Sequence, residues 1–179
     1  MNYEDYRWDG ITYGGAYIKA LFDYVKEHPF KNGLEVGFDQ GASALAFLRA
    51  CPEARLLSLD IDLCGIGNAR VRTSEVTSRF SFRCCDSREV LPSLEETYGP
   101  KPFDFIYIDG DHLYDAVKQD LFNADKLLAD GGYMIVDDAN PNHQHFGVGK
   151  AVAELCAERG YQKWDLAGSP SEPVILRRI

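Results

Sequence analysis

The stretch GLEVGFDQGAS, residues 33–43, decides the fold class of this chain. Its apolar beginning is typical of a buried β-strand, its glycines interrupt that strand, and a helical pattern follows over residues 42–50. A strand that leads through a glycine turn into a helix is the opening unit of an open α/β sheet. Such sheets bind ligands beyond the carboxyl ends of their strands, so the turn also marks where a site is expected.

The same alternation of short β-rich runs and longer helical patterns continues along the chain. An amphipathic helix at 14–28 precedes the first strand, at 33–37. Further strands are predicted at 54–60, 80–84, 104–109 and 132–137. Further helices are predicted at 42–50, within 64–78, within 87–97, at 113–128 before an Asp-Gly-Gly turn at 130–132, and at 147–159. Segments 161–166 and 173–178 indicate an antiparallel hairpin. The pattern predicts an α/β fold with a mainly parallel sheet.

Length and composition predict one soluble domain. The 179 residues suit a single domain over 1–179, with an N-terminal segment and helix at 1–30 and a core at 33–179. No apolar run approaches the roughly 20 residues that span a bilayer. The start, MNYEDYRWDG, has neither the basic residues nor the apolar segment of a secretion signal, so we expect a cytoplasmic protein that does not bind membranes.

Charge and cysteine content narrow the function classes. A net charge of -9 would repel phosphate backbones, which disfavours nucleic acid as a substrate and favours small molecules or cations. The five cysteines include no Cys-x-x-Cys pair, so neither a disulfide framework nor a zinc site is indicated.

Polar residues follow the first three predicted strands at the points where each ends. The turn after the first strand places Glu35, Gly37 and Gly41 in the pattern acid-x-Gly-x-x-x-Gly. Asp60 ends the second strand about 20 residues beyond the turn, where an acid can accept hydrogen bonds from ribose hydroxyls. The third strand ends at Asp86 and Ser87. Each residue alone is as consistent with a turn or a helix cap, but together and in order they indicate a nucleoside site.

The glycine turn disfavours a nicotinamide dehydrogenase. Dinucleotide binding uses G-x-G-x-x-G to bring a helix N-terminus to the pyrophosphate, whereas this turn has wider spacing and contains Glu35. An acid there favours a ligand with an ammonium group and no phosphate. S-adenosylmethionine, with its sulfonium, α-amino group and ribose, matches that description.

With this glycine turn and these strand-end acids, residues 33–179 resemble the class I S-adenosylmethionine-dependent methyltransferases. The resemblance implies a Rossmann-like sheet of seven strands in the order 3-2-1-4-5-7-6, with the seventh antiparallel and helices on both faces. It also implies that the turn holds the methionine part, Asp60 the ribose and Asp86 the adenine. The cofactor-binding residues implied by the resemblance are Glu35, Gly37, Gly41, Asp60 and Asp86, and from their positions we also expect Ser43, Ser87 and Asp111 to bind the cofactor.

Within that class, IDGDHLYDAVKQDL (108–121) and LLADGGYMIVDD (127–138) resemble the macrocin and rhamnosyl O-methyltransferase group. Catechol and caffeoyl-CoA O-methyltransferases are more distantly similar. These relatives commonly hold a divalent cation with an acid that ends the fourth strand and an Asp-Asp or Asp-Asn pair that ends the fifth. The resemblance therefore implies a metal site at Asp109, Asp137 and Asp138.

Strand geometry independently makes a cation plausible. If the fourth and fifth strands are neighbours, their ends lie about 4.8 Å apart, and carboxylates crowded into so small a volume need compensating charge. Oxygen ligands select Mg²⁺, Ca²⁺ or Mn²⁺ over zinc, and Mg²⁺ is the default for an intracellular site with few carboxylates. The alternative is that Asp138 closes a turn and Asp109 accepts backbone hydrogen bonds without a metal. Asp111, which follows a glycine in the same loop, is expected to face the cofactor.

His112 is the candidate general base. It follows Asp109 by three residues, so its imidazole could take the proton of a substrate hydroxyl as the oxygen attacks the sulfonium methyl. The alternative is that His112 only caps the following helix. The pair His143 and His145 could border the pocket or lie on the surface.

The acceptor site is the least defined part of the sequence. Four N-terminal aromatic residues could close over the pocket or pack on the first helix: Tyr3, Tyr6, Trp8 and Tyr13. Because no large insertion remains to form a cap, a second copy in a homodimer could complete the pocket.

The sequence thus predicts methyl transfer from S-adenosylmethionine to a hydroxyl of a small molecule, such as a sugar, a polyol or a phenol, assisted by Mg²⁺. The alternatives are a metal-independent methyltransferase acting on nitrogen or carboxylate, a non-catalytic nucleoside-binding module, and a dehydrogenase.

Overall fold

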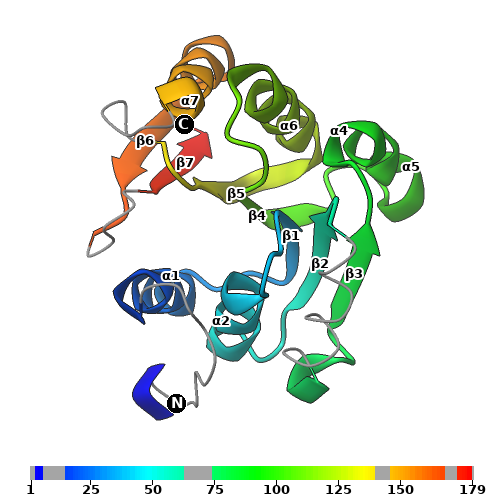
Figure 1. The fold of residues 1–179 in the computed structure, drawn as a ribbon, viewed down its shortest axis with the longest axis vertical. Helices are drawn as coiled ribbons and strands as arrows, with labels where there is room; N and C mark the ends of the chain where they lie inside the picture. The colour runs from blue at the N-terminus through cyan, green and yellow to red at the C-terminus, as the bar shows by residue number, and fades with distance from the viewer. Residues whose placement is uncertain (1–2, 6–14, 63–73, 140–145, 168–172, 179) are drawn as a thin grey trace.

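The computed structural model describes residues 3–5, 15–62, 74–139, 146–167 and 173–178. Its seven strands form one sheet in the order β3-β2-β1-β4-β5-β7-β6 (Figure 1). The strands are β1 (Asn32–Val36), β2 (Arg55–Asp60), β3 (Phe80–Cys84), β4 (Phe103–Ile108), β5 (Leu128–Val136), β6 (Tyr161–Asp165) and β7 (Val174–Arg178). β7 pairs antiparallel with both β5 and β6, and the other pairs are parallel. The predicted fold class, strand order and terminal hairpin are confirmed.

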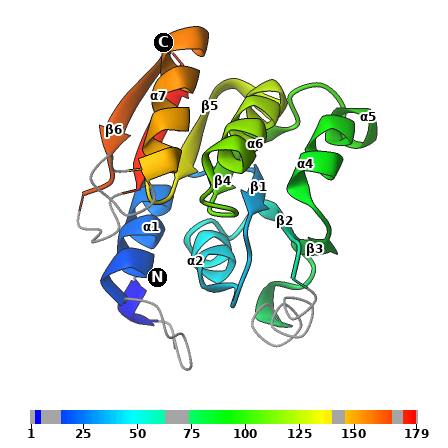
Figure 2. The ribbon, with the colours of Figure 1, turned by 45° about the horizontal axis from the view of Figure 1, so that its top comes forward.

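Helices cover both faces of this sheet (Figures 1 and 2). They are α1 (Gly15–Glu27), α2 (Ala42–Ala50), α4 (Ser87–Val90), α5 (Leu94–Tyr98), α6 (Tyr114–Leu127) and α7 (Phe146–Arg159). The core accordingly has two parts, one with α1 and α2 and one with α6 and α7. Along β4, Phe105 and Tyr107 belong to the first part and Ile106 to the second, as the alternation of side chains in a strand requires. None of the described helices is long and apolar enough to cross a membrane.

Local structure differs from the sequence-based prediction at three places. The helix predicted within 87–97 is divided into α4, a 3-10 turn at Leu91–Ser93 and α5, because Pro92 cannot donate a backbone hydrogen bond. The Asp-Gly-Gly segment lies inside β5, where the register against β4 shifts between Phe103 and Phe105. Of the region 64–78, residues 74–78 are described, and they contain a 3-10 turn at Ser74–Val76.

Three adjacent strand ends bring the expected site residues together. Val36 of β1 pairs with Ile108 of β4, and Ile108 pairs with Val136 of β5. Backbone hydrogen bonds continue one residue further, because the Asp109 N–H donates to Val36 and the Asp137 N–H donates to Ile108. The residues that follow each strand therefore lie in one row at the carboxyl edge of the sheet.

Gly37 allows β1 to leave the sheet beside β4. Its φ of +91° is in the range that favours glycine, and a Cβ built on it would lie 1.9 Å from the Asp109 carbonyl oxygen. Backbone atoms of the two strand ends thus occupy the space that any side chain would need.

We expect Gly37→Ala to destabilise the protein more than Gly99→Ala. Gly99 also has a positive φ, +87°, but nothing lies within 4 Å of its built Cβ. The control substitution therefore introduces backbone strain alone, on the order of 1–3 kcal/mol, whereas Gly37→Ala adds a steric clash. Urea unfolding of both variants measures the difference, and equal losses would contradict the close approach of β1 and β4.

Candidate active site

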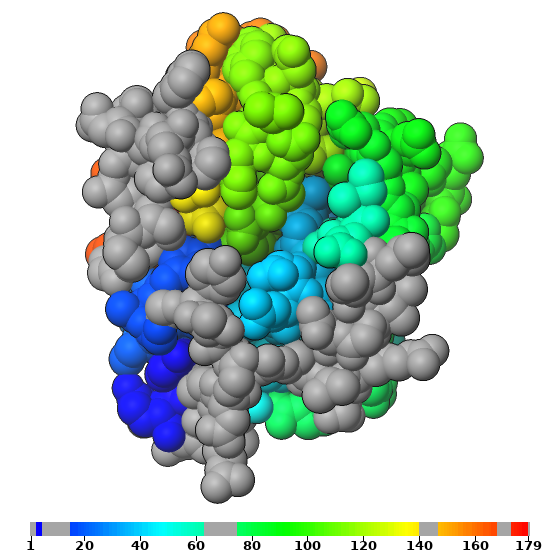
Figure 3. Space-filling view, viewed as in Figure 1, coloured from blue at the N-terminus to red at the C-terminus, as the bar shows by residue number. Residues whose placement is uncertain are grey.

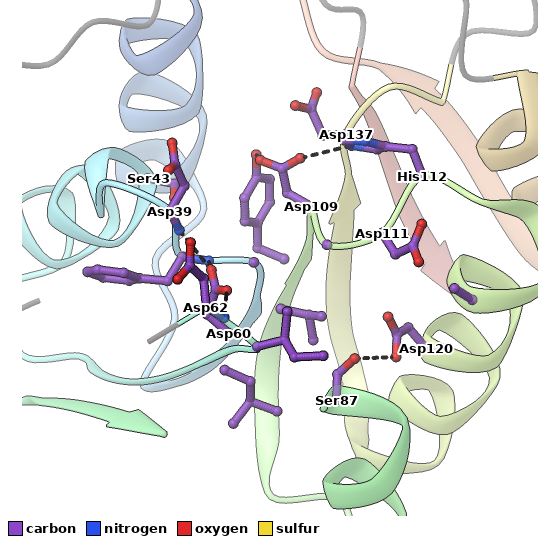
Figure 4. A pocket seen from close by; sticks show the side chains of 18 of the residues that line it. Asp39, Ser43, Asp60, Asp62, Ser87, Asp109, Asp111, His112, Asp120 and Asp137 are labelled. Atoms are coloured by element: carbon purple, nitrogen blue, oxygen red, sulfur yellow. Dashed lines mark hydrogen bonds and ion pairs between the residues drawn. The ribbon is translucent and has the colours of Figure 1, made fainter. Parts of the chain in front are cut away.

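A cavity of about 840 Å³ lies at the carboxyl edge of the sheet. In the space-filling view, α6, the start of α2 and the residues after β2 meet in this region (Figure 3). The cavity is lined by most of the predicted site residues, namely Gly37, Ser43, Asp60, Asp86, Ser87, Asp109, Asp111, His112, Asp137 and Asp138. Figure 4 shows how seven of these side chains are arranged around it, namely Ser43, Asp60, Ser87, Asp109, Asp111, His112 and Asp137. The fold therefore collects residues that are up to a hundred positions apart in the sequence.

Glu35 does not line this cavity, so it does not occupy the position that a direct contact with the cofactor's ammonium group would require. Its side chain is completely buried, and its two oxygens accept hydrogen bonds from the Ser43 and Ser58 hydroxyls. Burial raises the pKa of Glu35 to about 8. Because Ser43 lies between Glu35 and the cavity, the acid acts by orienting the serine, which is the residue that can reach a ligand.

The glycine turn is held in place by Asp60. One oxygen of its carboxylate accepts the N–H groups of Phe38 and Asp39, at 2.7 and 2.9 Å, and the other accepts the N–H of Asp62 at 2.8 Å. Asp60 also borders the cavity, where the ribose contact is predicted. Gly41, at the N-cap of α2 with φ of +75°, does not line the cavity and serves the shape of the turn.

Asp86 is engaged by its own neighbour. It caps α4 by accepting the Arg88 N–H, and its two oxygens accept the Arg88 Nε and Nη2 groups at 2.9 and 2.6 Å. The Arg88 guanidinium lowers the pKa of Asp86 below its ordinary value. Asp111 is similarly used locally, since it accepts the Leu113 N–H where α6 begins.

The opposite end of the cavity gathers three carboxylates and one imidazole. His112 Nε2 lies 3.5 Å from Asp109 Oδ1 and 3.3 Å from Asp138 Oδ2. Hydrogen bonding to Asp109 raises the pKa of His112, although partial burial opposes the shift. Burial and the charges of Asp109 and Asp138 raise the pKa of Asp137 to about 7. Asp138 lies in the turn after β5 and has a φ of +52°.

Two tyrosines that sequence analysis did not single out complete this end. The Tyr107 hydroxyl donates to Asp109 Oδ2 at 3.1 Å, and Tyr17 of α1 contacts Tyr107 through its own hydroxyl. Tyr107 is buried and Tyr17 is half-buried, and the loss of solvent around their hydroxyls raises both pKa values, so they remain neutral. The alternation in β4 contained a signal for Tyr107, because residues 107 and 109 project to the same side of a strand. Nothing in the sequence pairs Tyr17 with it.

The comparisons with known proteins agree with this geometry. A family model described as a methyltransferase domain matches residues 34–139, which is more than half of the chain. The chain belongs to this methyltransferase family. A search of curated protein sequences finds no significant match.

Solved methyltransferase structures share the fold. An O-methyltransferase from Bacillus cereus, solved with S-adenosylhomocysteine, is 21% identical, with 93% of this chain and 82% of that chain covered at a TM-score of 0.74. TomG from Streptomyces achromogenes, an O-methyltransferase involved in tomaymycin synthesis and solved with S-adenosylmethionine, is 22% identical, covering 90% and 79% at 0.72. PaMTH1 from Podospora anserina, bound to S-adenosylhomocysteine, is 18% identical, covering 90% and 77% at 0.75. At these identities the likeness concerns the fold, and the narrower resemblance to macrocin O-methyltransferase stays a prediction.

The predicted metal site of this methyltransferase has suitable donors but no preformed cage. Asp109, Asp137 and Asp138 supply the oxygen ligands that Mg²⁺ prefers, and their mutual repulsion is the kind that a cation relieves. In the described part of the chain, however, no three His, Cys, Asp or Glu side chains are grouped closely enough to hold a metal ion. A bound cation would require these carboxylates to rotate toward one another.

Several predicted pocket residues of the methyltransferase lie outside the described ranges. These are Tyr6, Trp8, Tyr13, His143 and His145. Tyr3 is described, and its ring packs edge-on against Phe22 of α1 with 5.8 Å between centroids, which matches the packing alternative.

We expect Glu35 to make the stability of the methyltransferase pH-dependent. Its folded-state pKa of about 8 lies above the ordinary value of 4.5, so the stability that the protonated acid contributes is full below pH 4.5 and is lost as pH rises toward 8. Glu35→Gln cannot ionise. Thermal unfolding at a series of pH values should therefore show wild type losing stability relative to Glu35→Gln between about pH 4.5 and 8. A constant difference over that range would show that Glu35 is ionised in the folded protein.

Proposed function

We propose that this chain transfers the methyl group of S-adenosylmethionine to a hydroxyl oxygen of a small molecule. The observation that carries the proposal is the division of one cavity into two chemically different ends. The glycine turn, Ser43 and Asp60 lie on one side, where a nucleoside and an amino-acid group can be held. His112 with Asp109, Asp137 and Asp138 forms the other, where a hydroxyl can lose its proton. Membership of the methyltransferase family supports the reaction type.

Methyl transfer itself requires little of the protein beyond orientation and proton removal. The acceptor oxygen attacks the sulfonium methyl, the carbon–sulfur bond breaks, and the sulfur leaves as a neutral thioether. The oxygen, carbon and sulfur atoms must be nearly collinear, so much of the acceleration comes from positioning both substrates in one cavity. The hydroxyl proton must also be accepted, and we assign that step to His112.

The carboxylates around His112 suit it to this role. An imidazole that takes a proton becomes positively charged, and Asp109 and Asp138 lie 3.5 and 3.3 Å from its Nε2 atom. They stabilise the imidazolium that proton transfer produces. Tyr107 holds Asp109 by donating a hydrogen bond to its other oxygen, which leaves Oδ1 directed at the imidazole.

We further propose that Asp109, Asp137 and Asp138 bind Mg²⁺ when the acceptor is present. The support is the crowding of three carboxylates, because burial together with the charges of Asp109 and Asp138 raises the pKa of Asp137 to about 7. A bound cation would make an acceptor hydroxyl more acidic. The roles of the protein groups derived above do not depend on it.

Calorimetry with the cofactor product tests the proposed function most directly. We expect S-adenosylhomocysteine to bind and NAD not to bind. Asp60→Asn should weaken S-adenosylhomocysteine binding about tenfold or more, because the amide can neither hold the turn nor accept from ribose as well as a carboxylate does. Asp165→Asn, an exposed acid on the edge strand β6, serves as the control and should bind normally. Binding of NAD without binding of S-adenosylhomocysteine would contradict the proposed methyltransferase function.

A panel of sugars, polyols and phenols, screened for release of S-adenosylhomocysteine, tests the acceptor end. With any acceptor found, His112→Ala should lower turnover by about 10²–10⁴-fold while cofactor affinity changes little. Loss of cofactor binding in this variant would instead show that His112 has a structural role. EDTA treatment followed by Mg²⁺ addition tests the metal, since full activity in EDTA would contradict metal assistance.

A further inference from the structure

Asp120 of α6 is a buried acid at the cavity that sequence analysis did not consider. It is 2% exposed, and its Oδ1 atom accepts a hydrogen bond from the Ser87 hydroxyl at 2.8 Å. Both residues line the cavity. Figure 4 shows this pair at the opposite end of the view from Asp137 and His112, with one Asp120 oxygen directed away from Ser87. The pair therefore belongs to the cofactor side of the cavity.

The pair of Ser87 and Asp120 offers only hydrogen-bond acceptors to the cavity. Ser87 has one hydroxyl proton, which it donates to Asp120. Ser87 is the only hydrogen-bond donor to the Asp120 side chain within the described residues. Burial raises the pKa of Asp120 to about 6, against the opposing effects of Ser87 and Arg88, so the group is still ionised at pH 7.5. A buried carboxylate with acceptor capacity to spare is costly unless a donor reaches it.

Asp86, which the family resemblance implies as the adenine contact, is less able to accept a hydrogen bond from a ligand than its position suggested. Both of its oxygens are taken by the Arg88 guanidinium, and one also caps α4. Asp120 lies beside the same short helix through Ser87 but has an oxygen that faces the cavity. The acid that follows β3 in the sequence is thus paired, and the acid contributed by α6 remains able to accept.

We propose that Asp120 accepts a hydrogen bond from the exocyclic amino group of the cofactor's purine and so selects an amino-purine over an oxo-purine. The inference rests on the proposed function, because it takes S-adenosylmethionine as the ligand. Adenine presents an N–H donor at this position, whereas hypoxanthine presents a carbonyl oxygen. With hypoxanthine, its carbonyl oxygen and the Asp120 oxygen would face each other in a buried site without a hydrogen bond, which weakens binding.

The experiment compares binding of S-adenosylhomocysteine and S-inosylhomocysteine by calorimetry at pH 7.5. Wild type should bind the adenosyl compound about tenfold tighter or more. Asp120→Asn should abolish or reverse this preference. Its amide oxygen can still accept from Ser87 while its amino group faces the cavity and favours the oxo-purine. Asp115→Asn, an exposed acid on the same helix that does not line the cavity, is the matched control and should keep the wild-type ratio.

Equal binding of the two compounds by wild type would overturn the inference while leaving the proposed function intact. So would an unchanged ratio in Asp120→Asn, since a merely structural acid would weaken both ligands alike. Failure of wild type to bind either compound would overturn the inference and the proposed function together. If Asp120→Asn does not fold, Ser87→Ala provides a second variant. It should reduce the preference because it no longer fixes the Asp120 carboxylate, and an unchanged preference would count against the proposal.

Discussion

The close contact between the ends of β1 and β4 is the constraint on which the site depends. A backbone without a side chain at Gly37 lies against the Asp109 carbonyl, in space that a Cβ would fill. This contact sets how closely the glycine turn, on the proposed cofactor side, approaches the acid cluster of Asp109, Asp137 and Asp138, on the proposed acceptor side. Parallel pairing of β4 with β5 then adds Asp137 and Asp138 to the same edge. A sheet with more separated strand ends would carry the same residues without forming one cavity.

The acids that line the cavity or lie behind it illustrate different ways in which a folded protein stabilises a carboxyl group. Glu35 is neutralised by a raised pKa and satisfied by two serines. Asp60 is satisfied by backbone N–H groups of the turn that it supports. Asp86 is paired with a guanidinium. Asp109 accepts a hydrogen bond from the Tyr107 hydroxyl, and its charge still repels that of Asp137. Only groups whose hydrogen-bonding capacity is not exhausted inside the protein can also serve a ligand.

Sequence patterns predicted the fold well and the partners of individual side chains poorly. The alternation of strands and helices, together with the family resemblance, gave the sheet order and the strand ends that surround the cavity. The pattern could not reveal that Glu35 is screened by Ser43, or that Arg88 occupies Asp86, because side-chain direction depends on packing around each strand end. Tyr17 and Asp120 were missed for a related reason. Each lies within an amphipathic helix, where a single polar contact with a distant strand or helix leaves no periodic signal.

The contact between Tyr17 and Tyr107 joins a part of the chain that matches the family model to a part that does not. The family model matches residues 34–139, which include Tyr107 and the whole cofactor side, while Tyr17 belongs to α1 outside that range. The segment that matches the family therefore contains the residues of the proposed cofactor side, but it does not supply every residue that lines the cavity. Substitutions in α1 could reshape the acceptor end of the cavity while leaving the glycine turn and Asp60 unaltered. Substrate choice and cofactor use can in that way diverge independently within one small domain.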